Sequence, residues 1–208
     1  MNHARLVIAT LLTSLLMLAC KDKPPTDDQQ KHIADVVASG GVVDSILPIP
    51  EQLARFRKTI TDRPDTLRHA SASIKGLVSR WTLAVASSDT AALNAMLLDR
   101  AEFAWLYYPD SKMSLPPYES PPQLLWGQML ATSEEGAKKI LKLFSTSSFK
   151  VVGVNCPTPP VTEGANQLHE GCLVNLEKIG GTPAEGSYFG TIIERDGRFK
   201  FVSFANRI

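Results

Sequence analysis

The sequence predicts an α+β fold, with helices in the first part of the chain and an antiparallel sheet in the last part. From Leu67 to Val85, apolar residues recur at steps of three and four, which is typical of one face of a long helix. From Ser147 onward the apolar period becomes two, which is typical of half-buried strands. The dipeptide Asp196-Gly197 predicts a two-residue hairpin turn between the last two strands.

The first twenty residues predict export and a lipid anchor. Arg5 precedes a mainly apolar run over residues 6–19. This run would span about 21 Å as a helix, less than the ~30 Å hydrocarbon core of a bilayer, so a cleaved signal is expected. The stretch LMLAC resembles the lipobox of bacterial lipoproteins, which implies that residues 1–19 are removed and that Cys20 is acylated. The alternative is an ordinary secretory signal followed by an incidental cysteine.

The lipobox resemblance also implies a location. We expect the protein in the cell envelope, held on the lipid bilayer through acylated Cys20 and facing the periplasm. Each buried methylene contributes ~0.8 kcal/mol, so two or three acyl chains would hold the protein there almost permanently. In Gram-negative lipoproteins, a residue other than Asp after the lipidated cysteine favours the outer membrane, and here that residue is Lys21.

Charge and motif content exclude several function classes. The chain has 22 Lys and Arg against 21 Asp and Glu, and removal of the signal takes away Arg5 alone. A neutral mature chain lacks the basic surface that nucleic-acid binding normally needs, so no nucleic-acid partner is expected. We find no phosphate-binding or dinucleotide-binding glycine motif, and no pair of histidines at helical ligand spacing. No cofactor and no metal ion is therefore expected.

Three cysteines are present, and lipidation of Cys20 would leave an even pair in an oxidising compartment. Cys156 ends the apolar run VVGVNC, and Cys172 begins the run CLVNL. Two neighbouring antiparallel strands would bring their sulfurs together, so we predict a structural disulfide between them. Free thiols or a redox pair are the alternatives.

Residues 20–31 are polar and predict a flexible tether. Residues 32–65 are expected to form an N-terminal helical extension, including a helix over residues 50–60 that begins at Pro50. Residues 66–208 are expected to form a single α+β domain.

Within this domain the long helix is expected to end near Ser88, and Asp89 is a suitable N-cap for a second helix over residues 91–98. Alternation in EFAWLYYP predicts a short strand over residues 102–108. Five prolines between positions 109 and 122 predict a loop. Two helices are expected next, one from Pro121-Pro122 and one capped by Ser133. The predicted strands cover residues 149–156, 168–177, 187–195 and 198–205.

This order of elements, together with the segment SRWTLAVASSDTAAL, resembles the nuclear-transport-factor-2-like (SnoaL-like) superfamily over residues 66–208. The resemblance implies a cone-shaped barrel, in which a curved antiparallel sheet wraps a long helix around an open-ended cavity. The segments AEFAWLYYP and ERDGRFKF are also similar to those of uncharacterised bacterial lipoproteins. The superfamily contains isomerases, dehydratases and non-catalytic binding domains, so the fold leaves the function open.

Glu102, Tyr107 and Tyr108 are the candidate catalytic residues. A carboxylate near a tyrosine in an apolar cavity could act as a general acid–base pair. The alternative is that the aromatic residues are core and that the charged residues form a solvated helix end. Trp81, Trp105 and Trp126 are the candidate ligand-pocket residues, with ordinary packing as the alternative.

Three functions are consistent with this sequence. The first is a non-catalytic envelope lipoprotein that binds a small apolar ligand or an envelope protein. The second is an isomerase or dehydratase that uses Glu102 as base and a tyrosine as hydrogen-bond donor. The third is a structural subunit that contacts its complex through the proline-rich loop. An exposed apolar patch within residues 109–126 would favour a protein partner.

Overall fold

The computed structural model describes residues 27–39, 47–144, 149–178 and 183–206. The chain divides into two compact units, Met1–Ile46 and Leu47–Ile208. In the first unit, α1 (Asp27–Ala38) begins inside the predicted tether, so residues 27–31 are helical and that part of the tether prediction is wrong. Its first turn carries Asp27 and Asp28, and negative charge stabilises a helix N-terminus. The predicted signal peptide and Cys20 lie outside the described residues.

The second unit begins with three helices. They are α2 (Ile49–Arg57), α3 (Ile74–Ala86) and α4 (Thr90–Ala95). The prediction of α2 from Pro50 is confirmed, because this proline lies in its first turn. Asp89 caps α4 as predicted, accepting a hydrogen bond from the backbone N–H of Ala92 at 2.9 Å.

The long helix predicted from Leu67 starts seven residues later than expected. Ser73 is its N-cap and accepts a hydrogen bond from the N–H of Gly76 at 3.0 Å. Before it, Ser71 forms an isolated bridge with Phe199, with N–O distances of 3.0 and 2.9 Å in the two directions. Ser71 thus pairs with the sheet instead of joining the helix, and a helical spacing of apolar residues could not reveal this long-range pairing.

The strand predicted over residues 102–108 is wrong, because the segment is helical. It forms α5 (Arg100–Glu102), the π-helical turn η1 (Phe103–Tyr107) and the 3₁₀ turn η2 (Tyr108–Asp110). A capping box starts it: the Asp99 carboxylate accepts from the N–H of Glu102, and the Glu102 carboxylate accepts from the N–H of Asp99. Another 3₁₀ turn, η3 (Lys112–Ser114), follows in the proline-rich loop.

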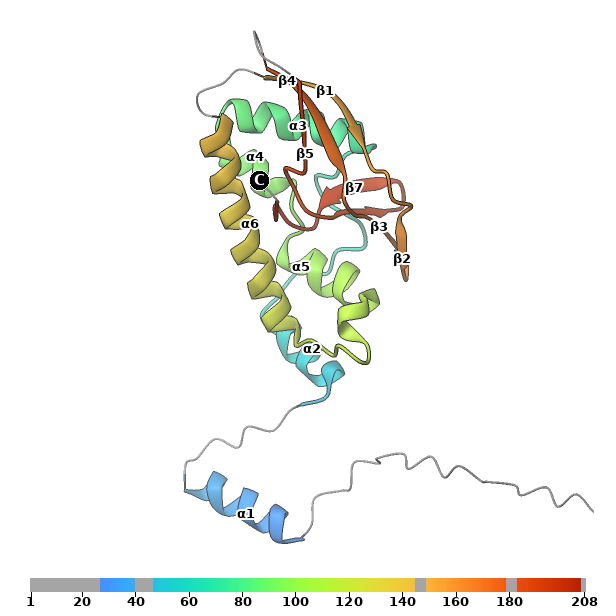
Figure 1. The fold of residues 1–208 in the computed structure, drawn as a ribbon. Coiled ribbons are helices and arrows are strands. Elements are labelled where there is room, and N and C mark those ends of the chain that lie inside the picture. The colour runs from blue at the N-terminus through green and yellow to red at the C-terminus, as the bar shows by residue number, and fades with distance from the viewer. Residues whose placement is uncertain (1–26, 40–46, 145–148, 179–182, 207–208) are drawn as a thin grey trace, which may run out of the picture. The chain divides into compact units, whose positions relative to one another are not determined.

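The two helices predicted after the loop are one continuous helix, α6 (Pro122–Phe144). Ser133 lies in its middle, and its hydroxyl accepts a hydrogen bond from the N–H of Phe204 at 3.2 Å. At Gly136 the helix approaches the chain so closely that a Cβ would lie 1.8 Å from the Phe204 carbonyl oxygen. Figure 1 shows α6 running along the unit from α2 to α3.

Within the described residues, seven strands form two antiparallel sheets instead of the single predicted meander. One sheet has the order β1-β4-β5 and the other has the order β2-β3-β6-β7. Their bounds are β1 Phe149–Asn155, β2 Val161–Glu163, β3 Asn166–His169, β4 Leu173–Lys178, β5 Pro183–Gly186, β6 Ile192–Arg195 and β7 Arg198–Phe201. Both sheets are open, so these described strands do not close into the expected barrel.

The predicted strand over residues 168–177 is split between the two sheets. It becomes β3 and β4, separated by a break at which Gly171 has a φ of +64°. The hairpin prediction is confirmed: Asp196 and Gly197 have φ values of +51° and +69° and connect β6 to β7. These positive φ values are what a two-residue type I′ turn requires.

Two clusters of buried apolar residues form the core of this unit. The sheet core gathers side chains of α3, α4 and both sheets around Trp81 and Phe189. The helical core gathers side chains of α2, η1 and the first half of α6 around Phe56 and Phe103, together with Leu168 and Ile193 of the sheet. The unit is α+β as predicted. The helical core and the sheet core lie next to each other along α6.

Candidate functional site

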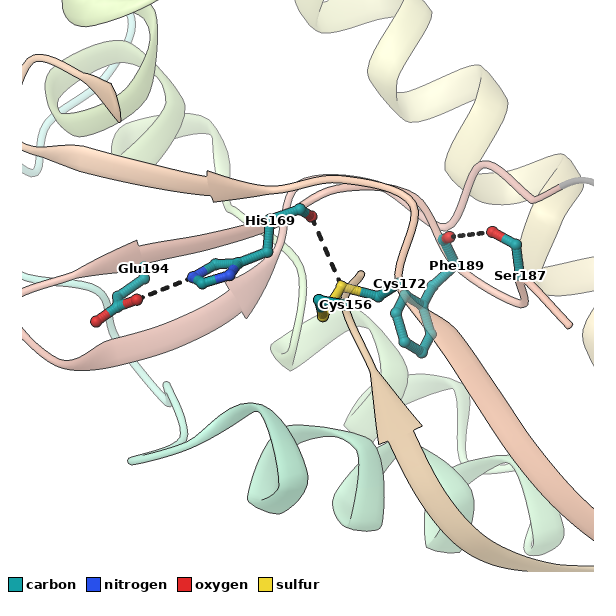
Figure 2. Close-up of a disulfide and its surroundings, with 6 residues drawn as sticks. All are labelled: Cys156, His169, Cys172, Ser187, Phe189 and Glu194. Carbon is teal, nitrogen blue, oxygen red and sulfur yellow. Dashed lines mark hydrogen bonds and ion pairs between the residues drawn. A yellow bond between two sulfur atoms is a disulfide. The ribbon is translucent and has the colours of Figure 1, made fainter. Parts of the chain in front are cut away.

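The predicted disulfide between Cys156 and Cys172 is present. Asn155 pairs with Leu173 at the ends of β1 and β4, so the two cysteines continue the register of that strand pair by one residue. The hairpin β2–β3 lies between them in sequence and belongs to the other sheet. Figure 2 shows the disulfide at the point where the chain leaves the β1-β4-β5 sheet for the β2–β3 hairpin and later returns to it. The bond therefore links the segment that follows β1 to the segment that precedes β4.

The candidate base Glu102 lies inside the protein, with 0% of its surface exposed. One carboxylate oxygen accepts a hydrogen bond from the N–H of Arg68 at 2.5 Å. The other accepts from the N–H of Asp99 at 2.9 Å and from Lys200 Nζ at 2.7 Å. Lys200 comes from β7 and is 2% exposed, so a fully buried ion pair connects α5 to the sheet. Both oxygens of Glu102 are therefore engaged by the protein.

Neither candidate tyrosine pairs with Glu102. The hydroxyl of Tyr108 donates to the backbone oxygen of Ser120 at 2.6 Å, and burial raises the pKa of Tyr108 to about 12. Burial also raises the pKa of Tyr107, whose hydroxyl makes a side-chain hydrogen bond with Ser111. The three candidate catalytic residues are close in sequence, but the structure does not assemble them into a carboxylate–tyrosine pair.

The three candidate pocket tryptophans are divided between the two cores. Trp81 is buried in the sheet core, with ring centroids of Phe144, Tyr188 and Phe189 at 6.3, 6.2 and 5.8 Å. Trp105 and Trp126 pack against the helical core. Trp81 therefore does not share a pocket with the other two.

Two arginines that the sequence did not single out lie over the ring of Trp105. The guanidinium carbon of Arg57 lies 3.7 Å from the centre of the Trp105 ring, and that of Arg63 lies 4.6 Å from it. Arg57 also donates from Nε and Nη2 to the backbone oxygen of Ala104 at 3.1 and 2.7 Å. No sequence pattern indicated this group, because its members are up to 48 residues apart and meet only when α2 packs on η1.

Large apolar side chains are exposed on the proline-rich segment, which we define as residues 111–124. Leu115 is 53% exposed, Tyr118 57% and Leu124 55%. The backbone of this segment is internally hydrogen-bonded: the N–H of Tyr118 donates to the oxygen of Leu115 at 2.9 Å, and the N–H of Ser120 donates to the oxygen of Met113 at 2.8 Å. These exposed side chains lie within residues 109–126, where an exposed apolar patch was expected to favour a protein partner.

Two shallow hollows lie elsewhere on the surface. One of about 210 Å³ is bordered by Leu83, Ser87 and Ala92 of α3 and α4, and one of about 120 Å³ by Thr132 and Asn206 beside α6. Neither is lined by Glu102, by the candidate tyrosines or by the candidate tryptophans.

In the described parts of the chain, no three His, Cys, Asp or Glu side chains gather as a metal site would require. None of the helices described by the structure combines the length and the apolar character needed to cross a membrane. Comparison of the chain with protein-family models, curated proteins and solved structures finds no match.

Proposed function

We propose that this chain is a lipid-anchored protein of the bacterial cell envelope that has no catalytic role and binds a partner protein through the proline-rich segment. The observation that carries the proposal is the exposure of Leu115, Tyr118 and Leu124 within ten residues. Exposed large apolar side chains that occur close together are typical of interaction sites, whereas single ones are common on any surface.

The charge of the segment supports an apolar mode of recognition. Lys112 and Glu119 are its only charged residues and have opposite signs. Electrostatic attraction of the partner therefore contributes little. The complex is stabilised by apolar area removed from water, at roughly 25 cal/mol per Å². The partner that fits is a second protein with an apolar pocket that accepts Leu115 and Tyr118.

The internal hydrogen bonds of the segment support the same proposal. Tyr108 is fully buried and holds the oxygen of Ser120, while Ser114 donates from its hydroxyl to the oxygen of Ser111 at 2.7 Å. A segment that is ordered before binding loses less conformational entropy when it binds. The proline-rich segment is thus suited to present its apolar side chains in one arrangement.

The engagement of Glu102 supports a non-catalytic role. A general base must come within hydrogen-bond reach of its substrate, whereas Glu102 is 0% exposed and both its oxygens already accept hydrogen bonds from the protein. Its ion pair with Lys200 explains the burial of both residues without any substrate.

The anchor is tested separately from the docking surface. Replacement Cys20→Ala should release the protein from the membrane fraction, because the acylated residue is lost. Retention of the Cys20→Ala variant in that fraction would contradict lipidation at this position.

The docking surface is tested by native electrophoresis of the membrane fraction in mild detergent, with the full chain detected by antibody. The wild-type protein should migrate as a complex that contains a different protein, and the double variant Leu115→Ser/Tyr118→Ser should migrate as the single chain. Leu83→Ser is the matched control, because Leu83 is 71% exposed but lies on α3.

Two results would contradict the docking proposal. One is wild-type protein that migrates as a single chain or as a complex built only of this chain. The other is a complex that persists in the double variant as it does in Leu83→Ser.

A further inference from the structure

The two arginines on Trp105 differ from their neighbours in having no acidic partner. Arg55 pairs with Glu51 at 2.7 Å, and Arg68 pairs with both Asp62 and Asp99. Among the described residues, no carboxylate lies within ion-pair distance of Arg57 or Arg63. Two positive charges therefore share one aromatic ring without neutralisation.

From this juxtaposition we propose that Arg57 and Arg63, held beside Trp105, form a binding site for a phosphate group. Two guanidiniums on one ring match a doubly charged anion, and guanidinium N–H groups donate charge-assisted hydrogen bonds to phosphate oxygens. Arg57 uses Nε and Nη2 on the oxygen of Ala104, which leaves its Nη1 group available. The proposal goes beyond partner binding by the proline-rich segment and does not depend on it.

The aromatic ring explains how the site can exist without its ligand. A guanidinium over the face of Trp is attracted by the π-electrons, with an interaction of roughly 0.5–2 kcal/mol. Trp105 therefore orients both arginines in advance, and Ala104 fixes Arg57 further. Less side-chain freedom is lost when an anion binds to such a pair.

The electrostatics point in the same direction. Burial lowers the pKa of Arg57, and the nearby positive charge of Arg63 lowers it further. An anion bound beside the two guanidiniums would weaken this repulsion. A third arginine, Arg100, lies over the ring of Phe56, which precedes Arg57 in the sequence, with its guanidinium carbon 4.6 Å from the centre of that ring.

The location of the site is compatible with a lipid headgroup or with free phosphate. Arg57 is the last residue of α2, and the chain enters this unit at Leu47, just before α2. The predicted membrane anchor at Cys20 would therefore be connected to the end of the unit that carries the two arginines. The phosphate of a lipid headgroup and inorganic phosphate present the same oxygens to them, so the experiment must separate these sources.

The test is calorimetric titration of the full-length protein, in non-ionic detergent at low salt, with three probes: inorganic phosphate, short-chain phosphatidic acid and short-chain phosphatidylcholine. We expect binding of phosphatidic acid or of inorganic phosphate, and about tenfold weaker binding in Arg63→Gln and in Arg57→Gln, because each loses charge-assisted hydrogen bonds. Arg55→Gln is the matched control, since it removes the same charge from α2 but leaves the site intact. Its dissociation constant should stay within about twofold of the wild-type value, as surface charges contribute little.

Each outcome of this titration either supports or overturns the proposed phosphate site. Binding of phosphatidic acid but not of inorganic phosphate assigns the site to a lipid headgroup, and binding of inorganic phosphate assigns it to the free anion. Arg63 is exposed, so Arg63→Gln should keep its melting temperature and remain interpretable if Arg57→Gln fails to fold. The proposal is overturned if neither phosphate probe binds, if phosphatidylcholine binds as tightly as phosphatidic acid, or if Arg55→Gln weakens binding as much as Arg63→Gln.

Discussion

The sheet core and the helical core are neighbours along α6, yet they present different surfaces. In the sheet core, aromatic rings pack around Trp81, and the Cys156–Cys172 disulfide crosslinks the chain. Outside the proline-rich segment, the most exposed large apolar residues are Leu83 on α3 and Val152 on β1. The helical core is covered by the proline-rich segment, which exposes three large apolar residues close together, and by arginines without acidic partners.

This contrast is the basis of the proposed division of the unit into a part that provides stability and a part that provides recognition. The proline-rich segment leaves apolar area in contact with water, and two guanidiniums on one ring repel each other. Beside the sheet core, the exposed large apolar side chains among the described residues lie on three separate elements, Leu83 on α3, Leu143 on α6 and Val152 on β1. We therefore place the recognition surfaces at the helical core, and the predictions that follow separate the two regions, beginning with the ion pair that joins them.

The largest effect is expected at the buried ion pair. Lys200→Met should lower the free energy of unfolding by about 3–5 kcal/mol, because it leaves Glu102 buried with an uncompensated charge. Denaturant unfolding followed by circular dichroism measures this loss.

The matched control for the ion pair is Lys139→Met, which breaks an exposed pair with Glu135 and should cost no more than about 1 kcal/mol. Adding Glu102→Gln to Lys200→Met should recover part of the loss. Equal losses in Lys200→Met and Lys139→Met would contradict the expected contribution of the buried pair to stability.

The disulfide should contribute about 3 kcal/mol to the sheet core, since the two cysteines are 16 residues apart and the bond restricts the unfolded chain. Reduction should lower the free energy of unfolding by this amount, and the intact mass should rise by two hydrogen atoms. The double variant Cys156→Ala/Cys172→Ala should be insensitive to reductant. An unchanged mass on reduction would contradict the bond.

Tyr108 tests how the helical core holds the proline-rich segment. Tyr108→Phe should cost about 1 kcal/mol at pH 7, because the hydrogen bond to Ser120 is lost. An unfolded tyrosine ionises near pH 10, whereas the buried Tyr108 has a pKa of about 12. The folded state thus holds this proton more tightly, and its stabilisation is complete below pH 10 and lost as the pH rises toward 12.

Stability of the wild-type protein should therefore fall more steeply between pH 10 and 12 than that of Tyr108→Phe. Denaturant unfolding at a series of pH values measures the two slopes. Tyr118→Phe is the control, because Tyr118 is exposed and its replacement should leave the wild-type slope unchanged. Identical slopes in the wild type and in Tyr108→Phe would contradict the assignment.

The sequence correctly predicted those features of the fold that depend on interactions between residues close together in the chain or within one strand pair. The N-cap Asp89, the Asp196-Gly197 turn and the strand-end cysteines are confirmed, because each acts through residues close by in the chain or through one strand pair. The resemblance to the nuclear-transport-factor-2-like superfamily and the lipidation of Cys20 stay predictions.

The errors arose where distant or competing interactions decide the structure. The alternating segment at residues 102–108 becomes helical because the Asp99–Glu102 capping box starts a turn and because the neighbours Phe103 and Ala104 are both buried, which an amphipathic strand could not achieve. The pairing of Glu102 with Lys200 and the stacking of Arg63 on Trp105 join residues 98 and 42 positions apart, so no spacing rule could find them.

The smallest effect on stability is expected at the proline-rich segment itself. Leu115→Ser/Tyr118→Ser should change the free energy of unfolding by no more than about 0.5 kcal/mol, because both side chains are exposed. The same variant should lose its partner. A large loss of stability would mean that these side chains serve folding, contrary to the proposed division between the two regions.

The central claim is tested most directly by site-specific photo-crosslinking of the full chain in living cells. A photoreactive residue is placed in turn at Tyr118, at Leu83 and at Val152; the last two are 71% and 64% exposed and therefore more accessible than Tyr118. The account predicts one discrete adduct with a different protein from position 118 and none from positions 83 and 152. An adduct of equal yield from all three positions, or none from position 118, would contradict it.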